Sequence, residues 1–139
     1  MKSVFADSFY FFALLSRHDS YHQRIVQLVE SSRFRLVTTS FVLIEVGDGL
    51  AGGRRRTNLV ELIKDVRSDP NNTIVPATEG LFEQGLDLFR KRDDKTWSIT
   101  DCISFVVMKK MGIAEALTGD KHFVQAGFKA LLLSPEESF

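Results

Sequence analysis

Short apolar segments alternate with longer segments of helical periodicity along the chain, and this alternation restricts its fold more than any other feature. Apolar segments bounded by turn-forming residues predict strands at 4–6, 35–38, 73–75, 114–117 and 130–133. Apolar residues at helical spacing predict helices between them, at 9–16, 21–32, 41–46, 57–66, 78–90, 98–111 and 122–125. Strands joined through helices form parallel sheets. We therefore predict an α/β fold, a three-layer α/β/α sandwich around a short-stranded, mainly parallel central sheet.

The length and charge of the chain fit one domain without an overall field that attracts nucleic acid. Its 139 residues predict a single domain, 1–139, with a sizeable core. The 18 basic and 18 acidic residues cancel, so nucleic-acid binding would have to use a local patch or a bound cation. The single cysteine, Cys102, excludes an internal disulfide and suits a reducing compartment. The sequence shows no signal peptide and no apolar run of the ~18 residues that span a membrane. We therefore expect a cytoplasmic protein without membrane contact.

Four acidic residues lie next to buried strands or within apolar helix patterns, where a charged side chain is unusual. Asp7 follows the first predicted strand and Asp120 follows the strand at 114–117. Because parallel strands point the same way, both acids are expected at one edge of the sheet, where open α/β folds bind their ligands. Glu45 and Asp101 lie within apolar helix patterns. An unpaired charge on such a face would cost several kcal/mol, so a partner or an ion is expected there.

Each of these acids also has a purely structural explanation. Asp7 and Asp120 could cap the helices that follow them. Asp101 stands three residues after Ser98, the spacing of a capping box. Glu45 could pair with one of the three arginines at 54–56. Four carboxylates at one edge, however, repel one another, which favours protonation or a bound cation. Oxygen ligands alone suit Mg²⁺ or Mn²⁺ rather than zinc.

The spacing of these acids and their neighbours resembles the PIN-domain ribonucleases, in particular the VapC-type toxins of toxin–antitoxin modules and solitary PIN-domain nucleases. The resemblance runs from Val4 to Leu133. Four motifs carry it: Asp7 closing the first strand, Thr39-Ser40-x-x-x-x-Glu45, Trp97-Ser98-Ile99-Thr100-Asp101-Cys102-Ile103-Ser104-Phe105, and Leu117-Thr118-Gly119-Asp120-x-x-Phe123. It implies that Asp7, Glu45, Asp101 and Asp120 form a catalytic metal site. It also implies that Ser8, Thr100 and Thr118 orient these carboxylates or a metal-bound water, although plain capping explains the three hydroxyls nearly as well.

The resemblance implies an endoribonuclease that cleaves RNA with water activated by Mg²⁺ or Mn²⁺. Asp7, Asp101 and Asp120 would be metal ligands, and Glu45 would hold a second ion or position the attacking water. The products would be a 5′-phosphate and a 3′-hydroxyl. The family also implies an antitoxin protein as partner and a homodimer.

RNA has to be held as well as cut. Arg54, Arg55 and Arg56 beside a glycine-rich segment, and Lys121 next to Asp120, could bind phosphates. A solvated helix start explains the arginines somewhat better.

Several other features are expected to serve the structure rather than the chemistry. Four glycines within 47–53 predict the most flexible segment, and residues 134–137 a polar tail. Trp97 is expected in the core rather than as a platform for bases. Cys102 is expected to be a small buried side chain, and His122 a surface residue without a catalytic role.

Two other functions compete with the nuclease. One is a PIN module that binds RNA or protein without cleaving it, against which the complete set of four acids argues. The other is an Asp-based phosphotransfer domain of the receiver type. That domain would need paired acids near the first strand, where this chain has only Asp7.

Overall fold

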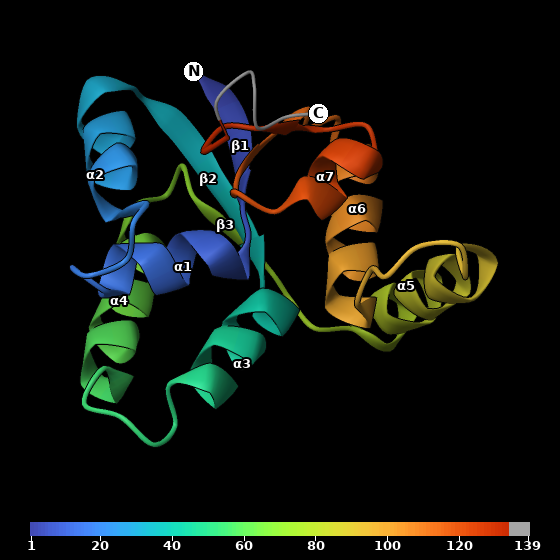
Figure 1. Ribbon diagram of the computed structural model, residues 1–139, viewed down its shortest axis with the longest axis horizontal. Coiled ribbons are helices and arrows are strands. Elements are labelled where there is room, and N and C mark those ends of the chain that lie inside the picture. The colour runs from blue at the N-terminus through green and yellow to red at the C-terminus, as the bar shows by residue number, and fades with distance from the viewer. Residues whose placement is uncertain (134–139) are drawn as a thin grey trace.

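The computed structural model describes residues 1–133 and has a five-stranded parallel sheet at its centre (Figure 1). The strands are β1 (Lys2–Ala6), β2 (Phe34–Thr39), β3 (Thr73–Val75), β4 (Glu115–Leu117) and β5 (Lys129–Ala130). Their order in the sheet is β3-β2-β1-β4-β5, and every neighbouring pair is parallel. The predicted parallel sheet is confirmed. The polar tail predicted at 134–137 lies outside the described residues.

Helices cover both faces of this sheet. They are α1 (Ser8–Leu15), α2 (His22–Ser31), α3 (Ser40–Gly49), α4 (Arg56–Ser68), α5 (Glu79–Lys91), α6 (Ile99–Met111) and α7 (Lys121–Gln125). In Figure 1, α1, α2 and α4 lie to the left of the strands, and α5, α6 and α7 lie to the right. The predicted α/β/α sandwich is therefore confirmed. Among the described helices, none has the length and apolar character needed to cross a membrane.

The strand order places β1 and β4 side by side at the centre of the sheet. Ala6 pairs with Leu117, so the residues that follow these strands emerge together at the carboxyl edge. The chain leaves β1 toward β2 on one side, while β4 lies on the other side. Such a reversal of strand order opens the crevice in which α/β folds bind their ligands.

A cluster of phenylalanine rings joins the three elements that meet at this edge. Phe123, on α7, is fully buried. Its ring centroid lies 6.4 Å from that of Phe5 on β1 and 4.9 Å from that of Phe105 on α6. Trp97 extends the cluster, with its ring 5.0 Å from that of Phe105. Trp97 is only 5% exposed, and the guanidinium of Arg92 lies over its ring, which confirms its predicted place in the core.

The glycine-rich segment is more regular than predicted. Helix α3 continues through Gly47 and ends at Gly49, so the expected loosening of the chain before residue 50 is wrong. A Cβ at position 49 would lie 2.8 Å from Cζ of Phe12. The glycine therefore allows α3 to approach α1 closely, and tertiary packing overrides its low helix propensity.

The last strand is shorter than the predicted segment at 130–133. The backbone N–H groups of Leu131 and Leu132 still donate to Ala116 and Thr118, but Leu133 donates back to Ala130 in a turn. The hydrogen bonds from Leu131 and Leu132 do not continue as a regular ladder, because β4 itself ends at Leu117, and β5 therefore ends at Ala130.

Gly85→Ala is expected to destabilise the protein, because Gly85 is where α5 crosses α6. A Cβ at this position would lie 2.2 Å from Cγ1 of Ile103 and 3.3 Å from its Cα, so the two helices would have to move apart. Overpacking of this kind costs typically ~1–3 kcal/mol.

Gly80→Ala is the matched control on the same helix, since nothing lies within 4 Å of a Cβ there. It should be neutral or gain up to ~1 kcal/mol from helix propensity. Urea unfolding of the two variants measures the difference, and equal free energies of unfolding would contradict the close packing at Gly85.

Candidate active site

Asp7 and Thr118 connect the ends of the two central strands. Asp7 is 3% exposed and occupies the N-cap position of α1, but its side chain makes no capping hydrogen bond. Its Oδ2 instead accepts a hydrogen bond of 3.0 Å from the Thr118 hydroxyl. That hydroxyl in turn accepts the backbone N–H of Asp120 at 3.1 Å. The suggestion that the Asp7 side chain caps α1 is therefore wrong, because the pairing of β1 with β4 brings the hydroxyl of Thr118, the residue after β4, to the carboxylate.

The environment of Asp7 opposes its ionisation. Burial raises the pKa of its carboxyl from 3.8 to about 7, and the negative charges of Asp101 and Asp120 add to this effect. The backbone amide of Ser8 and the hydroxyl of Thr118 act in the opposite direction and stabilise the carboxylate. A carboxyl of this kind is half ionised near neutral pH, and a cation beside it would favour the ionised form.

Asp101 combines a structural role with a place in the site. The backbone N–H of Asp101 donates to Oγ of Ser98 at 3.0 Å, and Oδ2 of Asp101 accepts the backbone N–H of Ser98 at 3.2 Å. This is the predicted capping box. The same Oδ2 lies 3.0 Å from Nδ1 of His122. Burial raises the pKa of Asp101, the contact with His122 lowers it, and the charge of Asp120 raises it again.

Asp120 caps α7 and faces Asp101. Its Oδ1 accepts the backbone N–H of His122 at 2.8 Å, as predicted for a cap, and lies 3.5 Å from Nδ1 of the same residue. One potential ligand atom from each of Asp101, Asp120 and His122 lies within 4.8 Å of the others. His122 is predicted to be a surface residue, whereas in the structure it is a half-buried member of this group. Its position two residues after a capping aspartate was the available signal.

Among the described residues, Glu45 is not part of the group of potential ligands formed by Asp101, Asp120 and His122. It is half-buried on α3, whose first turn is capped by Oγ1 of Thr39 at 3.1 Å from the amide of Val42. Helix α3 packs against α6, the helix that carries Asp101. Within residues 1–133, Glu45 makes no ion pair, so the alternative pairing with the arginines at 54–56 is not formed.

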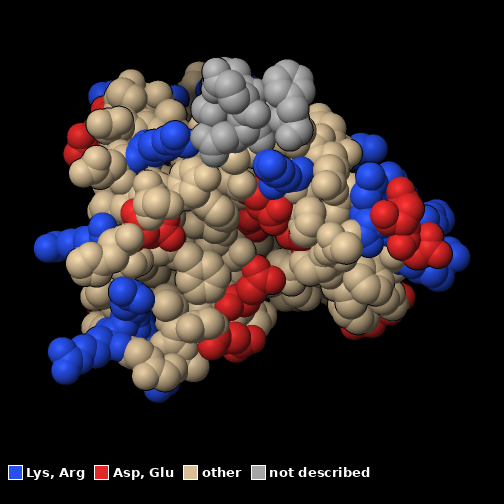
Figure 2. All heavy atoms as spheres, in the orientation of Figure 1, with Lys and Arg blue, Asp and Glu red and all other residues tan. Residues whose placement is uncertain are grey.

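The side chains of the other predicted residues make no hydrogen bond to the acids within residues 1–133, except that of Thr118. Ser8 and Thr100 are half-buried, and in the described part of the chain their hydroxyls make no hydrogen bond, unlike that of Thr118. Lys121 is exposed, as are the arginines at 54–56. The loop that leads into α4 lies at the lower left of Figure 1, away from the meeting point of β1, α6 and α7. Figure 2 shows acidic atoms gathered at the centre of this face and basic atoms mostly toward its edges.

Cys102 does not add a nucleophile to the site. Its side chain is fully buried. Burial, and then the negative charge of Asp101, raise the pKa of the thiol to about 11. The thiol therefore stays protonated at neutral pH, which agrees with the predicted role of a small buried side chain.

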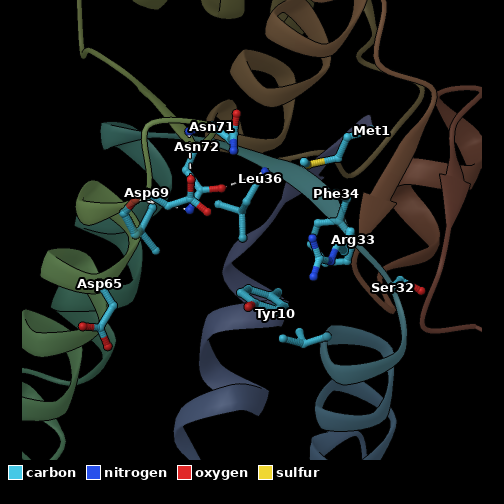
Figure 3. A pocket seen from close by; sticks show the side chains of 12 residues that line it. Met1, Tyr10, Ser32, Arg33, Phe34, Leu36, Asp65, Asp69, Asn71 and Asn72 are labelled. Atoms are coloured by element: carbon cyan, nitrogen blue, oxygen red, sulfur yellow. Dashed lines mark hydrogen bonds between the residues drawn. The ribbon is translucent and has the colours of Figure 1, made fainter.

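A pocket of about 460 Å³ lies at the opposite edge of the sheet (Figure 3). Met1, Phe34 and Asn72 line it and stand at the amino ends of β1, β2 and β3, and Tyr10 also borders it. The four acids do not line this pocket. The chemistry expected of them is therefore separate from it.

Thr118→Val is expected to destabilise the protein by ~1–3 kcal/mol, because it removes the hydroxyl that serves both Asp7 and the amide of Asp120. Valine fills nearly the same volume, so packing is kept. Thr118→Ser keeps the hydroxyl and is the control. Thermal unfolding at pH 7 compares the two, and a valine variant as stable as the serine variant would contradict the bridging role.

Comparison with known proteins identifies the family. A model of the PIN domain matches residues 4–129. Two curated relatives, both the 23S rRNA-specific endonuclease VapC20 of Mycobacterium tuberculosis (strains CDC 1551 / Oshkosh and ATCC 25618 / H37Rv), are 28% identical over 125 residues, which cover 90% of this chain and 95% of theirs. The crystal structure of VapC20, described as a Sarcin-Ricin loop cleaving toxin, superposes with a TM-score of 0.78 at 27% identity and the same coverage. The family match over most of its length, on the predicted fold and with acids at the predicted edge, shows that this chain belongs to the PIN domain family.

Proposed function

We propose that the chain, as one PIN-like nuclease domain over 1–139, is a metal-dependent endoribonuclease of the toxin type. The observation that carries this proposal is the convergence of Asp7, Asp101 and Asp120 at the carboxyl edge of the sheet. The side chains of Asp7 and Asp101 are buried, at 3% and 8% exposed respectively. Neither has a lysine or arginine partner within residues 1–133. Buried charges without a compensating cation are rare in proteins that do not use them.

The donor set fits a hard divalent cation. Carboxylates supply most of the potential ligands, and burial, followed by the repulsion between these carboxylates, raises the pKa values of Asp7 and Asp101. Mg²⁺ or Mn²⁺ would relieve this repulsion. When bound, such an ion lowers the pKa of water and offsets the negative charge of the phosphate that is cleaved.

In this proposal each of the four acids has its own role in binding metal or positioning water. Asp7, Asp101 and Asp120 hold the ion, directly or through water. Glu45 holds a second ion or positions the attacking water from α3. The hydrogen bonds that Asp101 and Asp120 make as caps hold their carboxylates in place, and Thr118 does the same for Asp7.

Three hydroxyl groups and four basic side chains also have proposed roles. The hydroxyl groups of Ser8, Thr100 and Thr118 orient the carboxylates or a water molecule. The exposed cations bind RNA phosphates, and they are Arg54, Arg55, Arg56 and Lys121.

The relatives suggest the substrate and partners. VapC20 is a 23S rRNA-specific endonuclease, and its crystal structure is described as that of a Sarcin-Ricin loop cleaving toxin. We propose a structured ribosomal RNA as the substrate class of this chain, an antitoxin as its protein partner, a homodimer as its assembly and the cytoplasm as its location.

An RNA cleavage assay tests the proposal. Ribosomal RNA is incubated with the protein and Mg²⁺ or Mn²⁺, with EDTA, and with EDTA followed by excess metal. We expect cleavage with either ion, none with EDTA, and recovery after metal is returned. Undiminished cleavage in EDTA would exclude a metal mechanism. Binding of RNA without cleavage under all conditions would favour the non-catalytic PIN module instead.

A further inference from the structure

The imidazole of His122 stands where a ligand of the proposed ion would stand. Its Nδ1 lies 3.0 Å from Oδ2 of Asp101 and 3.5 Å from Oδ1 of Asp120. Neighbouring ligands of an octahedral ion, with bonds of roughly 2.1 Å, are roughly 3.0 Å apart. One ligand atom from each of the three side chains lies within 4.8 Å of the others, so the three groups are close enough to share one ion.

The second ring nitrogen of His122 has its own partner. Nε2 lies 3.2 Å from Oγ1 of Thr96. In a neutral imidazole one nitrogen carries the proton and the other a lone pair. With an ion bound between the three side chains, Nε2–H would donate to Thr96 and Nδ1 would present its lone pair to the ion, whereas without the ion Nδ1–H donates to Asp101. Histidines that bind metals usually donate their other N–H to a protein group in this way.

The protein also holds this ring in place. The backbone N–H of His122 donates to Asp120, and the side chain is 28% exposed. The next residue, Phe123, is fully buried against Phe5 and Phe105. The position of the imidazole is therefore set by the cap of α7 and by the core, and it does not resemble that of a freely moving surface histidine.

We propose that His122 binds the active-site ion through Nδ1 and makes the site prefer Mn²⁺ to Mg²⁺. Mg²⁺ favours oxygen ligands, whereas an imidazole nitrogen favours transition metals. A site with oxygen ligands alone would discriminate less between the two ions. The inference rests on the proposed function, since it concerns the same ion.

Binding experiments with the two ions test this selectivity. Mn²⁺ is titrated into metal-free protein, free Mn²⁺ is measured by its EPR signal, and Mg²⁺ is added as competitor. We expect wild-type protein to bind Mn²⁺ at least ~10-fold more tightly than Mg²⁺. His122→Asn keeps an N–H donor near Asp101 but removes the imidazole. It should lose ~10-fold or more in affinity for Mn²⁺, the size of effect seen for groups around metal sites, while Mg²⁺ affinity changes little.

Pulsed EPR of the bound Mn²⁺ gives a readout independent of activity. The wild-type protein should show the hyperfine coupling of a directly bound imidazole nitrogen, and His122→Asn should lose it. His18→Asn is the control, because His18 is exposed on the loop before α2 and should leave the coupling unchanged.

The outcomes separate this inference from the proposed function. If Mn²⁺ binds and RNA is cleaved, but no nitrogen coupling is found or the preference survives in His122→Asn, the inference is wrong and the nuclease stands. If neither ion binds, both are wrong. Circular dichroism of each variant verifies that it is folded.

Discussion

Asp101→Asn is expected to lower RNA cleavage by at least about 100-fold, since even groups that only orient metal ligands contribute up to that much. The asparagine oxygen can still accept the backbone N–H of Ser98, so the start of α6 should be kept. What is lost is one negative charge between His122 and Asp120. The initial rate of cleavage at saturating Mn²⁺ and Mg²⁺ measures the effect.

Asp94→Asn is the matched control for this prediction. Asp94 is an exposed carboxylate that pairs with Arg92 at 3.0 Å on the loop before α6. Its replacement should leave cleavage unchanged. If Asp101→Asn cleaves RNA as fast as this control, Asp101 does not belong to the catalytic site.

Asp7→Asn is expected to abolish cleavage and yet stabilise the metal-free protein at neutral and alkaline pH. The pKa of Asp7 is raised to about 7 by burial and by the neighbouring acids, against 3.8 in an unfolded chain. The folded state therefore binds this proton more tightly than the unfolded state does. The stability that this group contributes is fully present below about pH 3.8 and is lost as the pH rises through about 7.

The size of this effect follows from the pKa shift. At about 1.4 kcal/mol per pKa unit, the charged Asp7 carboxylate costs a few kcal/mol above pH 7. Asparagine can still accept the hydroxyl of Thr118 but carries no charge. For a chain of this size the variant should melt on the order of 10 °C higher at pH 8 in EDTA.

The pH profile is the decisive measurement for Asp7. The difference in Tm between Asp7→Asn and wild type should grow from pH 5 to pH 8, because only the wild type has this carboxyl to ionise. Added Mn²⁺ should raise the Tm of the wild type more than that of the variant. A Tm difference that does not vary with pH would show that ionisation of Asp7 does not destabilise the folded protein.

The fold could be predicted because its signals are local. The apolar segment at Val4–Ala6, the capping box of Ser98 and Asp101, and the turn at Gly112 each depend on residues a few positions apart. The same holds for Asp120, whose cap on α7 uses the amide two residues later. Segments whose structure depends on distant neighbours were missed. Helix α3 continues to Gly49 because of Phe12, and β5 ends early because β4 does.

The amino-acid sequence by itself determined the alternation of strands and helices and the edge of the sheet at which Asp7 and Asp120 lie. Only the tertiary structure decided how each acid is held. The partner of Asp7 is Thr118, 111 residues away, and that of Asp101 is His122, 21 residues away. Local rules assign an aspartate at a helix start to its own helix, whereas packing of β1, β4, α6 and α7 adds partners from distant parts of the chain. Burial, which exists only once the core is assembled, raises the pKa of Asp7. Asp7 is therefore a candidate metal ligand rather than a helix cap.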